Sequence, residues 1–371
     1  MNTAGSRSTT ASVRHRLLVV IVNYKTIRLT LACLGSLEKE LKDLPGCRVT
    51  VVDNASGDGP ELDEAIRSHG WSEWVTLHVA AHNGGFSAGN NFAIRPALAS
   101  GEPPSFILLL NSDTEVRPGA LRILLEFMET HPEIGIAGSG IENPDGSDWP
   151  IAFRFITPSS QLLSGFRLGL MDYVFAGHLV ARQMGQECSA PVDWVAGACM
   201  IVRREVFEAI GLLDEGYFLY FEEVDFCLRA RRAGWPCWYV PQSRVMHIGG
   251  QSSGLVGIGG QSFGLDPSAK VPRVPAYWHQ SRRRYFLKNF GFARAMAADL
   301  AFGIGYATWR LRRRLQRKPD LDPPQLLADF WRQSVFCAGS RSADSFQSAP
   351  FSKLSEKGRN GESKTPPKVS Q

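Results

Sequence analysis

Two side chains in this sequence, Asp113 and His247, have the chemistry of metal ligands and stand beside strand-like segments. Asp113 follows the apolar run 106–110, and His247 closes a strand-like run that starts at Trp238. A carboxylate at the end of a strand can bind Mg²⁺ or Mn²⁺ while the ion bridges phosphates, and an imidazole can complete such a site. Taken alone, Asp113 is typical of a turn residue and a lone histidine is commonly structural. The two together favour a divalent-metal site.

The densest acidic cluster consists of Glu222, Glu223 and Asp225, directly after the aromatic run 217–221. Acidic side chains in the first turn of a helix stabilise the helix dipole, which accounts for one or two of them. Three carboxylates exceed the needs of a helix cap, and a carboxylate beside apolar rings is a reasonable general base. The cluster therefore predicts proton-transfer chemistry, with helix capping as the alternative.

A further carboxylate, Asp53, ends another apolar strand in Val52-Asp53-Asn54-Ala55-Ser56-Gly57. A carboxylate in this position can accept a hydrogen bond from the edge of a nucleobase or from a ribose hydroxyl. An Asx turn, in which the side chain bonds its own backbone, explains the residue equally well.

The elements that must position these residues follow a repeating strand–helix order. Apolar runs at 17–22, 49–52, 75–79 and 106–110 are typical of buried strands, and helical patterns cover 26–41, 60–69 and 86–99. This order predicts an α/β fold with an open, mostly parallel sheet flanked by helices. Ligands of such sheets bind beyond the carboxyl ends of the strands, where we expect Asp53, the loop 82–85 and Asp113 to meet.

The C-terminal part has a different character. Residues 292–314 are apolar with interrupting charges and then strongly basic, which favours a helix lying on a membrane surface over a spanning one. A solvated basic helix face is the alternative. Residues 1–15 and 341–371 are predicted to be a disordered leader and a disordered tail. The duplicated segment 249–265 is expected to form a flexible loop.

The composition of the chain limits the classes of binding partner and the cellular compartment that we expect. The formal net charge of +5 is too small to indicate nucleic-acid binding, but the basic clusters 282–284 and 310–318 suit an anionic membrane surface or a phosphate. No signal peptide or long uninterrupted apolar stretch is present, so we expect a soluble or peripheral protein. Seven scattered cysteines without a pairing framework indicate reduced thiols and a cytoplasmic location.

Five segments occur in a recognisable order along the chain. They are Val20-Ile21-Val22-Asn23-Tyr24, residues 51–56, residues 83–91, Leu110-Asn111-Ser112-Asp113-Thr114, and a long block from Asp193 through Glu222–Asp225 to Gly234-Trp235. Together they resemble the family 2 glycosyltransferases of the GT-A fold, especially the rhamnosyltransferase-like branch. The resemblance covers residues 16–290 and implies a GT-A domain there, followed by an amphipathic, basic helical extension over 291–340.

The resemblance also implies roles for individual residues. The donor-binding residues would be Asn23, Asp53, Asn83, Asn111, Ser112 and Asp113. Asp113 and His247 would bind Mg²⁺ or Mn²⁺, although Asn111 stands where some members have aspartate. The second position of the family's Glu-Asp-X-Asp motif deprotonates the acceptor hydroxyl, and here it is Glu223, one methylene longer; Asp225 and Glu222 remain candidates. The residues bordering the junction of donor and acceptor would be Trp194, Gly197 and Ala198.

The reaction implied by the resemblance is a single displacement with inversion at the anomeric carbon of a nucleotide sugar. The branch suggests deoxythymidine-diphosphate rhamnose as the donor. The basic C-terminal region favours a glycan growing on a lipid diphosphate as the acceptor, at the inner face of the cytoplasmic membrane. A basic residue among 282–284 is expected to hold a phosphate or assist the leaving group.

Two other functions compete with this one. A nucleotide-dependent oxidoreductase requires Gly-X-Gly-X-X-Gly after the first strand, where this chain has Asn23-Tyr24-Lys25-Thr26. A catalytically inactive GT-A fold could instead serve as a binding module in a polysaccharide assembly complex. The joint presence of Asp53, Asp113, Glu223 and His247 argues against an inactive copy.

Overall fold

The computed structural model describes residues 16–149, 152–167, 180–182, 187–249, 272–318 and 322–339. The predicted leader 1–15 and tail 341–371 lie outside the described residues. So does the duplicated segment 249–265, apart from its first residue.

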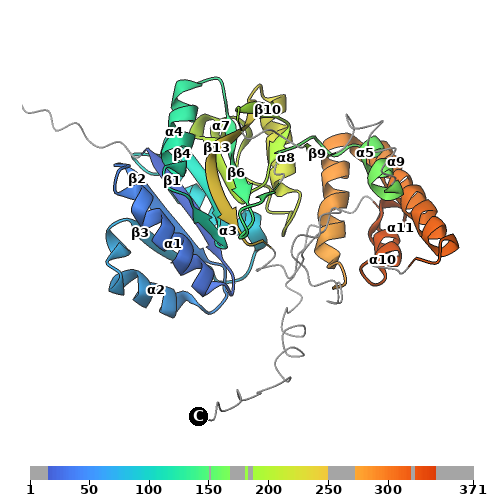
Figure 1. Cartoon of the computed structure of the whole chain (residues 1–371), viewed down its shortest axis with the longest axis horizontal. Helices are drawn as coiled ribbons and strands as arrows, with labels where there is room; N and C mark the ends of the chain where they lie inside the picture. Colours follow the sequence, from blue (N-terminus) through green and yellow to red (C-terminus); the bar gives the residue numbers. More distant parts are fainter. Residues whose placement is uncertain are drawn as a thin grey trace, which may run out of the picture.

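The first half of the chain is a strand–helix repeat. Its elements are β1 (Leu17–Asn23), α1 (Ile27–Leu41), β2 (Cys47–Asp53), α2 (Gly59–Ser68), the 3₁₀ turn Trp71–Glu73, β3 (Val75–Val79), α3 (Gly85–Leu98) and β4 (Phe106–Asn111). The strands pair in parallel in the order β3-β2-β1-β4. The apolar runs form central strands because helices cover both faces of the sheet (Figure 1).

The second half completes the sheet with mixed pairing. Its elements are β5 (Thr114–Val116), α4 (Ala120–Thr130), β6 (Ile136–Glu142), β7 (Asp148–Trp149), β10 (Ala190–Val192), β12 (Cys199–Arg203) and β13 (Cys237–His247). Within the described ranges the order is β10-β13-β6-β12-β4-β1-β2-β3. Strand β12 runs antiparallel between β4 and β6, and β13 is parallel to β6. The predicted open α/β sheet flanked by helices is confirmed, with mixed pairing beyond β4.

Short elements and helices surround this sheet. A small sheet contains β8 (Ala152–Phe153), β9 (Ala181–Arg182) and β11 (Trp194–Val195), and the helices nearby are α5 (Pro158–Phe166), α7 (Arg204–Ile210) and α8 (Glu222–Arg232). Glycines follow α7 and α8, and Gly211 and Gly234 have φ of 76° and 90°.

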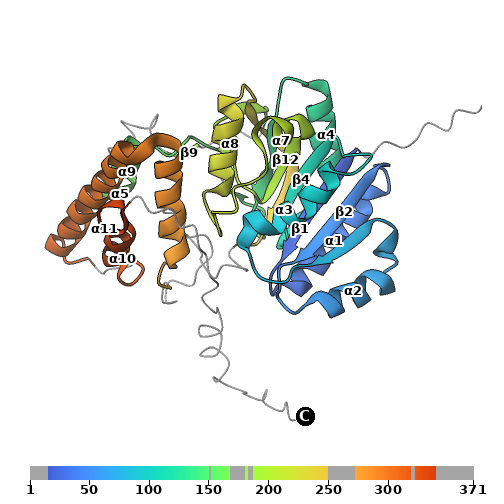
Figure 2. The same ribbon diagram turned by 180° about the vertical axis from the view of Figure 1, so that it is seen from behind.

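The predicted C-terminal helical extension is present beside the sheet (Figure 2). Helix α9 (Ala276–Leu315) bends at Gly291, where φ is 79°, and α10 (Leu326–Gln333) and α11 (Val335–Ala338) pack against it. Helix α5 also packs closely on α9. Among the described helices, none combines the length and the apolar character needed to cross a bilayer.

The bend in α9 buries two arginines that the sequence suggested as phosphate ligands. Arg282 forms an ion pair with Asp299 across the bend and donates to Gln161 Oε1 at 2.7 Å. Arg283 is buried and donates to the carbonyl of Gln333 at 2.8 Å. A phosphate-binding role for these two side chains is therefore wrong, because their guanidinium groups serve the packing of the helical extension.

Gly85, at the start of α3, has a backbone that no other residue fits. Its φ is 83°, and a Cβ atom there would lie 2.0 Å from the carbonyl oxygen of Phe218. We predict that Gly85→Ala lowers the free energy of unfolding by at least about 2 kcal/mol, through steric overlap and backbone strain. Urea denaturation measures this loss.

The matched control is Gly101→Ala, since a Cβ atom at that exposed glycine meets nothing within 4 Å. We expect a change within about 0.5 kcal/mol for the control. Similar losses in both variants would contradict the packing of α3 against the loop at Phe218.

Candidate active site

The structure brings the two predicted metal ligands together. A two-residue turn, Ser112-Asp113, joins β4 to β5, and β5 pairs antiparallel with the end of β13 so that His247 lies opposite Thr114. The amide of Ile248 donates to the carbonyl of Asp113 at 3.1 Å. As a result, His247 Nε2 lies 3.1 Å from Asp113 Oδ1, although 134 positions separate the two residues.

The surroundings of this pair suit a cation. Burial raises the pKa of Asp113, but hydrogen bonding and the charge of His247 outweigh that effect, so the net pKa is lowered and the carboxylate is ionised. The side-chain amide nitrogen of Asn111 lies 3.2 Å from the same Nε2 atom. His247 Nδ1 is buried with no hydrogen-bond partner in the part of the chain that is described, and the indole of Trp149 stacks on the ring at 4.9 Å.

These observations fit a Mg²⁺ or Mn²⁺ ion bound by two side chains. A carboxylate oxygen and an imidazole nitrogen already face each other, as two ligands of one ion would. Among the residues described, no group of three or more His, Cys, Asp or Glu side chains gathers closely enough to hold an ion. An ion at Asp113 and His247 would therefore require further ligands from phosphate or water.

The predicted donor-binding residues of the first two strands form one buried network. Asn23 and Asp53 lie side by side at the ends of β1 and β2, and Asn23 Nδ2 donates to Asp53 Oδ1 at 3.0 Å. The hydroxyl of Ser56 donates to the same carboxylate oxygen. Thr30 donates to Asn23 Oδ1 at 2.8 Å, and the Thr26 hydroxyl lies 3.0 Å from that of Ser112. These bonds link β1, β2 and β4 at their carboxyl ends, the usual ligand position in such sheets.

The predicted loop residue Asn83 orders the start of α3. Its Oδ1 accepts hydrogen bonds from Asn54 Nδ2 and from the amide of Gly85, both at 2.9 Å. The amide of Phe86 donates to the carbonyl of Phe218 at 2.8 Å. The loop after β3 is therefore attached on one side to β2 and on the other to the chain that leads into α8.

The backbone enters α8 in a strained conformation. Tyr220 and Phe221 both have φ of 69°, an uncommon value for bulky residues. Strain of this kind costs about 1–3 kcal/mol per residue and is concentrated at functional sites. Here it immediately precedes Glu222 and Glu223, so it fixes where the first turn of the helix points.

Glu222 and Glu223 are short of partners. Glu222 is 3% exposed and Glu223 is half-buried, and one carboxylate oxygen of each has no hydrogen-bond partner among the described residues. Burial raises the pKa of Glu223 to about 7. Burial, and then the charge of Glu223, raise the pKa of Glu222 well above its usual value. A carboxylate that gains its proton near neutral pH suits general-base chemistry.

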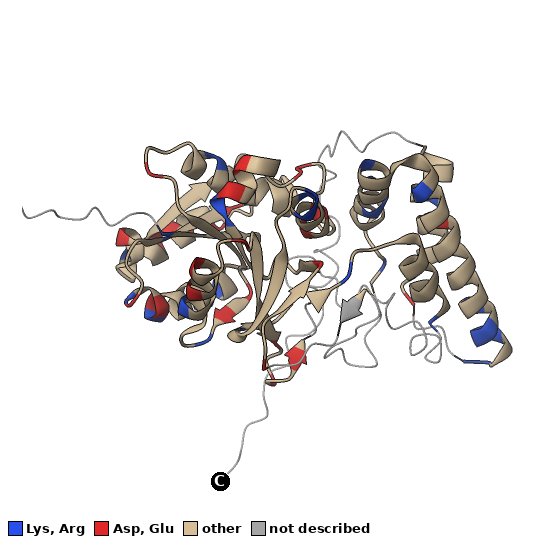
Figure 3. Cartoon of the chain, turned by 90° about the horizontal axis from the view of Figure 1, so that it is seen from above, with Lys and Arg blue, Asp and Glu red and all other residues tan. Residues whose placement is uncertain are grey.

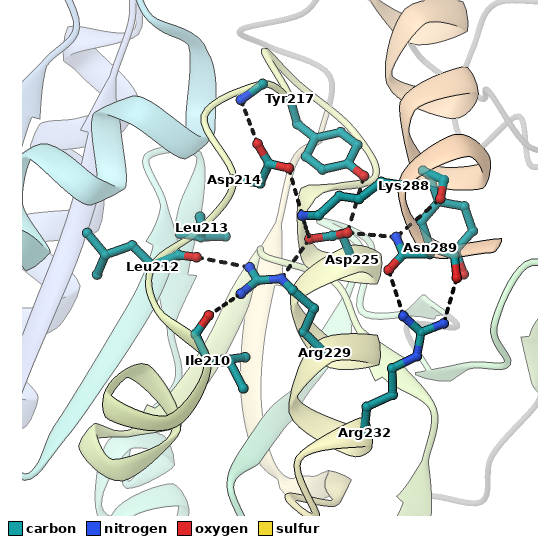
Figure 4. A network of polar contacts seen from close by, with 12 residues as sticks. Ile210, Leu212, Leu213, Asp214, Tyr217, Asp225, Arg229, Arg232, Lys288 and Asn289 are labelled. Atoms are coloured by element: carbon teal, nitrogen blue, oxygen red, sulfur yellow. Dashed lines mark hydrogen bonds and ion pairs between the residues drawn. The ribbon is translucent and has the colours of Figure 1, made fainter. Parts of the chain in front are cut away.

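Asp225 is in the opposite situation. It is completely buried, and its Oδ1 accepts from Asn289 Nδ2 at 2.7 Å and from the Tyr217 hydroxyl at 3.3 Å. Its Oδ2 accepts from Arg229 Nε at 2.9 Å and Lys288 Nζ at 2.7 Å. Figure 4 shows these donors surrounding the carboxylate. Four donors satisfy this group, which makes it suited to structure rather than to proton transfer.

The same network clamps the chain that leads into α8. Arg229 donates to the carbonyls of Ile210 and Leu212 at 2.6 and 2.9 Å (Figure 4). Lys288 bridges Asp225 to Asp214, with 2.7 Å to each. The first segment of α9 therefore holds both the approach to α8 and its first turns.

The three predicted junction residues differ in position. The carbonyl of Ala198 accepts from the amide of Asn111 at 3.0 Å, and a Cβ atom at Gly197 would lie 3.2 Å from the ring of Phe86. Ala198 therefore contacts the end of β4, next to Asp113, and Gly197 lies against the start of α3. The indole of Trp194 instead stacks on Phe153 at 4.2 Å and donates to the carbonyl of Arg154.

Several residues of this region carry no signal in the sequence. Trp149, which stacks on His247, lies in a segment without regular periodicity, and Lys288 and Asn289 lie more than 60 positions from Asp225. No spacing rule connects them to the acidic cluster. The packing of α9 beside α8 in the folded chain is what brings these donors to Asp225.

The fold is an open α/β sheet with polar side chains at the carboxyl ends of its strands, the edge at which such folds bind ligands. A family model described as "Glycosyltransferase like family 2" matches residues 15–257, more than half of the chain. The chain therefore belongs to the family 2 glycosyltransferases, as the sequence segments predicted.

Individual relatives agree with this family. The N-acetylglucosaminyl-diphospho-decaprenol L-rhamnosyltransferase of Mycobacterium tuberculosis is 32% identical over 216 residues, which cover 56% of this chain and 68% of the relative. The dTDP-rhamnosyl transferase RfbF of Shigella flexneri is 26% identical, covering 64% of this chain and 71% of the relative. Among solved structures, S. aureus TarS 1-349 matches with a TM-score of 0.47 and 14% identity, covering 86% of this chain and 81% of TarS.

The Asp225 network predicts strong coupling between α8 and α9. Lys288→Met removes one of two cationic donors from a buried carboxylate, and we expect a loss of about 1–3 kcal/mol in the free energy of unfolding. A double-mutant cycle with Asp225→Asn, measured by urea denaturation, should give a coupling energy above about 0.5 kcal/mol.

The control is Lys42→Met, because Lys42 forms an exposed pair with Glu38 at 3.8 Å. The free energy of unfolding of this variant should fall by less than about 1 kcal/mol. Additive effects of the Lys288 and Asp225 substitutions would show that the two helices are not coupled through this carboxylate.

Proposed function

We propose that this protein is an inverting glycosyltransferase that transfers a sugar from a nucleotide-sugar donor to a hydroxyl of a growing cell-surface glycan. One observation carries the proposal. Contacts lead from the Asp113–His247 pair to Asn111 and on to Ala198, and Gly197 lies against the ring of Phe86, whose amide donates to Phe218, five residues before Glu223. These contacts support the proposal that the metal ligands Asp113 and His247 and the candidate base act in one site.

Glu223 is the proposed general base. Its half-buried carboxylate lies in the first turn of α8. Its raised pKa of about 7 gives it a high affinity for the proton of an attacking hydroxyl. Asp225 is the proposed positioning residue, since its four donors hold the helix that carries Glu223. Glu222 is buried, and burial and then the charge of Glu223 raise its own pKa well above the usual value, so it stays protonated while Glu223 reacts.

The donor side follows from the carboxyl ends of β1, β2 and β4. Asp113 and His247 would hold Mg²⁺ or Mn²⁺, which when bound offsets negative charge on the leaving nucleoside diphosphate. Asn23, Asp53, Asn83, Asn111 and Ser112 would contact the donor's nucleotide. Gly197 and Ala198 would lie where donor and acceptor meet, with Trp194 supporting them from the small sheet.

The relatives guide the choice of donor and acceptor. Several of them are named as rhamnosyltransferases, and the one from M. tuberculosis is named for a lipid diphosphate acceptor. We therefore propose deoxythymidine-diphosphate rhamnose as the donor and a lipid-linked glycan as the acceptor. The enzyme would act in the cytoplasm as a peripheral protein at the inner face of the membrane.

Thermal-shift measurements with a panel of nucleotide sugars test the donor site. We expect one nucleotide class to raise the melting temperature by several degrees with Mn²⁺ and far less with EDTA, because binding to the native state stabilises it. Asp113→Ala should remove this shift. Asp145→Ala, which changes an exposed loop carboxylate bonded to Ser147, is the control and should retain it. If the folded protein shows no change in melting temperature with any nucleotide sugar, the donor-site proposal is wrong and an inactive binding module is favoured.

The pH dependence of transfer tests Glu223. A base must be deprotonated before it reacts, so kcat/KM should rise with pH through about 7, the raised pKa of Glu223. Glu223→Gln should lower kcat by about 10²–10⁴-fold. Glu222→Gln, the matched control, should keep substantial activity and leave the midpoint near 7, because burial is what raises the pKa of Glu223. If the pH dependence of kcat/KM were the same in Glu223→Gln as in the parent protein, a residue other than Glu223 would be the base.

A further inference from the structure

The second segment of α9, residues 292–315, exposes a row of large apolar side chains. Their exposed fractions lie between 43% and 76%, and the residues are Phe292, Leu300, Ile304, Leu311 and Leu315. The last four follow spacings of 4, 7 and 4 residues, which places them on one face of the helix. Exposed apolar side chains gathered in this way mark an interaction surface.

This face cannot turn inward, because the opposite face is tightly packed. Gly305 approaches α5 so closely that a Cβ atom on it would lie 2.6 Å from the carbonyl of Leu162. A Cβ atom on Gly303 would lie 2.3 Å from the indole of Trp331 in α10. Tyr306 and Trp309 are buried on the same side. The apolar row is therefore a fixed outer surface of the helical extension, at the edge of the molecule far from the large sheet (Figure 2).

Positive charge accompanies the row. From Leu300 to Lys318 the sequence contains no acidic residue, and its last nine positions include six basic ones. Arg314, Arg317 and Lys318 are exposed, and Figure 3 shows basic residues at the C-terminal end of this segment. An apolar face bordered by arginine and lysine is the pattern of a helix that lies in the interface of an anionic bilayer.

We propose that residues 292–318 form a docking surface for a membrane containing anionic lipids, with the apolar row inserted among the acyl chains and the basic end at the headgroups. The charge distribution favours this occupant over a second copy of the chain, because Asp299, the one acidic residue of 292–318, is buried and the face offers no exposed carboxylate to the basic end of another copy. The inference deepens the proposed function by naming the surface that would bring the enzyme to a lipid-linked acceptor. The apolar row and its charges are observed independently of the donor site.

Co-sedimentation with vesicles tests the surface. The full chain should bind vesicles of phosphatidylcholine with about 30% phosphatidylglycerol at least about tenfold more tightly than vesicles of phosphatidylcholine alone, and 0.5 M salt should weaken binding. The double variant Ile304→Glu/Leu311→Glu should reduce binding about tenfold or more. Arg314→Glu/Arg317→Glu should remove the preference for phosphatidylglycerol. The control Phe92→Glu changes a 47%-exposed side chain on α3 and should bind normally.

Any of three results would overturn the docking surface. The first is unchanged vesicle binding by Ile304→Glu/Leu311→Glu, and the second is no binding by the parent protein. The third is a parent dimer in sedimentation velocity that becomes a monomer in Ile304→Glu/Leu311→Glu, which would make this face an interface between copies. Melting curves with nucleotide sugars, run on every variant, confirm folding. They also separate the two proposals, because nucleotide binding with failed docking would leave the transferase assignment standing.

Discussion

The buried carboxylate of Asp225 is the contact on which the geometry of the candidate site depends. It lies three residues after Glu222 in α8, and its four donors come from the loop before α8, from α8 itself and from α9. Removing a charge from water is costly unless every lone pair finds a donor, so these partners must hold one arrangement. That arrangement keeps Tyr220 and Phe221 in their strained conformation and presents Glu223 at the start of the helix. The first segment of α9, which supplies Lys288 and Asn289, thus supports the candidate site.

A second constraint is the burial of polar side chains at the sheet edge. Asn23, Asp53 and Asp113 are nearly buried, and each carboxylate is stabilised by neighbouring hydrogen bonds. Glu222 and Glu223 lack such stabilisation, so burial shifts their pKa upward while that of Asp113 is lowered. The carboxyl groups of Asp113 and of Glu222 and Glu223 therefore differ in pKa in opposite directions, as the proposed ion-binding and proton-accepting roles require.

The sequence predicts the parallel half of the fold well because its signals are local. Apolar runs of β1 to β4 and the helical periodicity between them require no knowledge of distant contacts. Strand β6, Ile136-Ala137-Gly138-Ser139-Gly140-Ile141-Glu142, was not anticipated, since its glycines and serine have low strand propensity. It forms because β12 and β13 pair with it on both sides, and a Cβ atom on Gly138 would overlap Val195. The pairing of Asp113 with His247 was expected from their residue types, whereas the role of Lys288 depends on the packing of α9 beside α8, which no local pattern encodes.

The stereochemistry of transfer tests the central claim most directly, because a single displacement with Glu223 as base must invert the anomeric carbon. Proton NMR of slow donor hydrolysis, recorded before the released sugar equilibrates between anomers, reports the configuration without knowledge of the acceptor. We predict that the first anomer to appear has the configuration opposite to that of the donor, and that its formation depends on Glu223. Release of the sugar with retained configuration would contradict the account, since it requires a second displacement or a different use of the carboxylates.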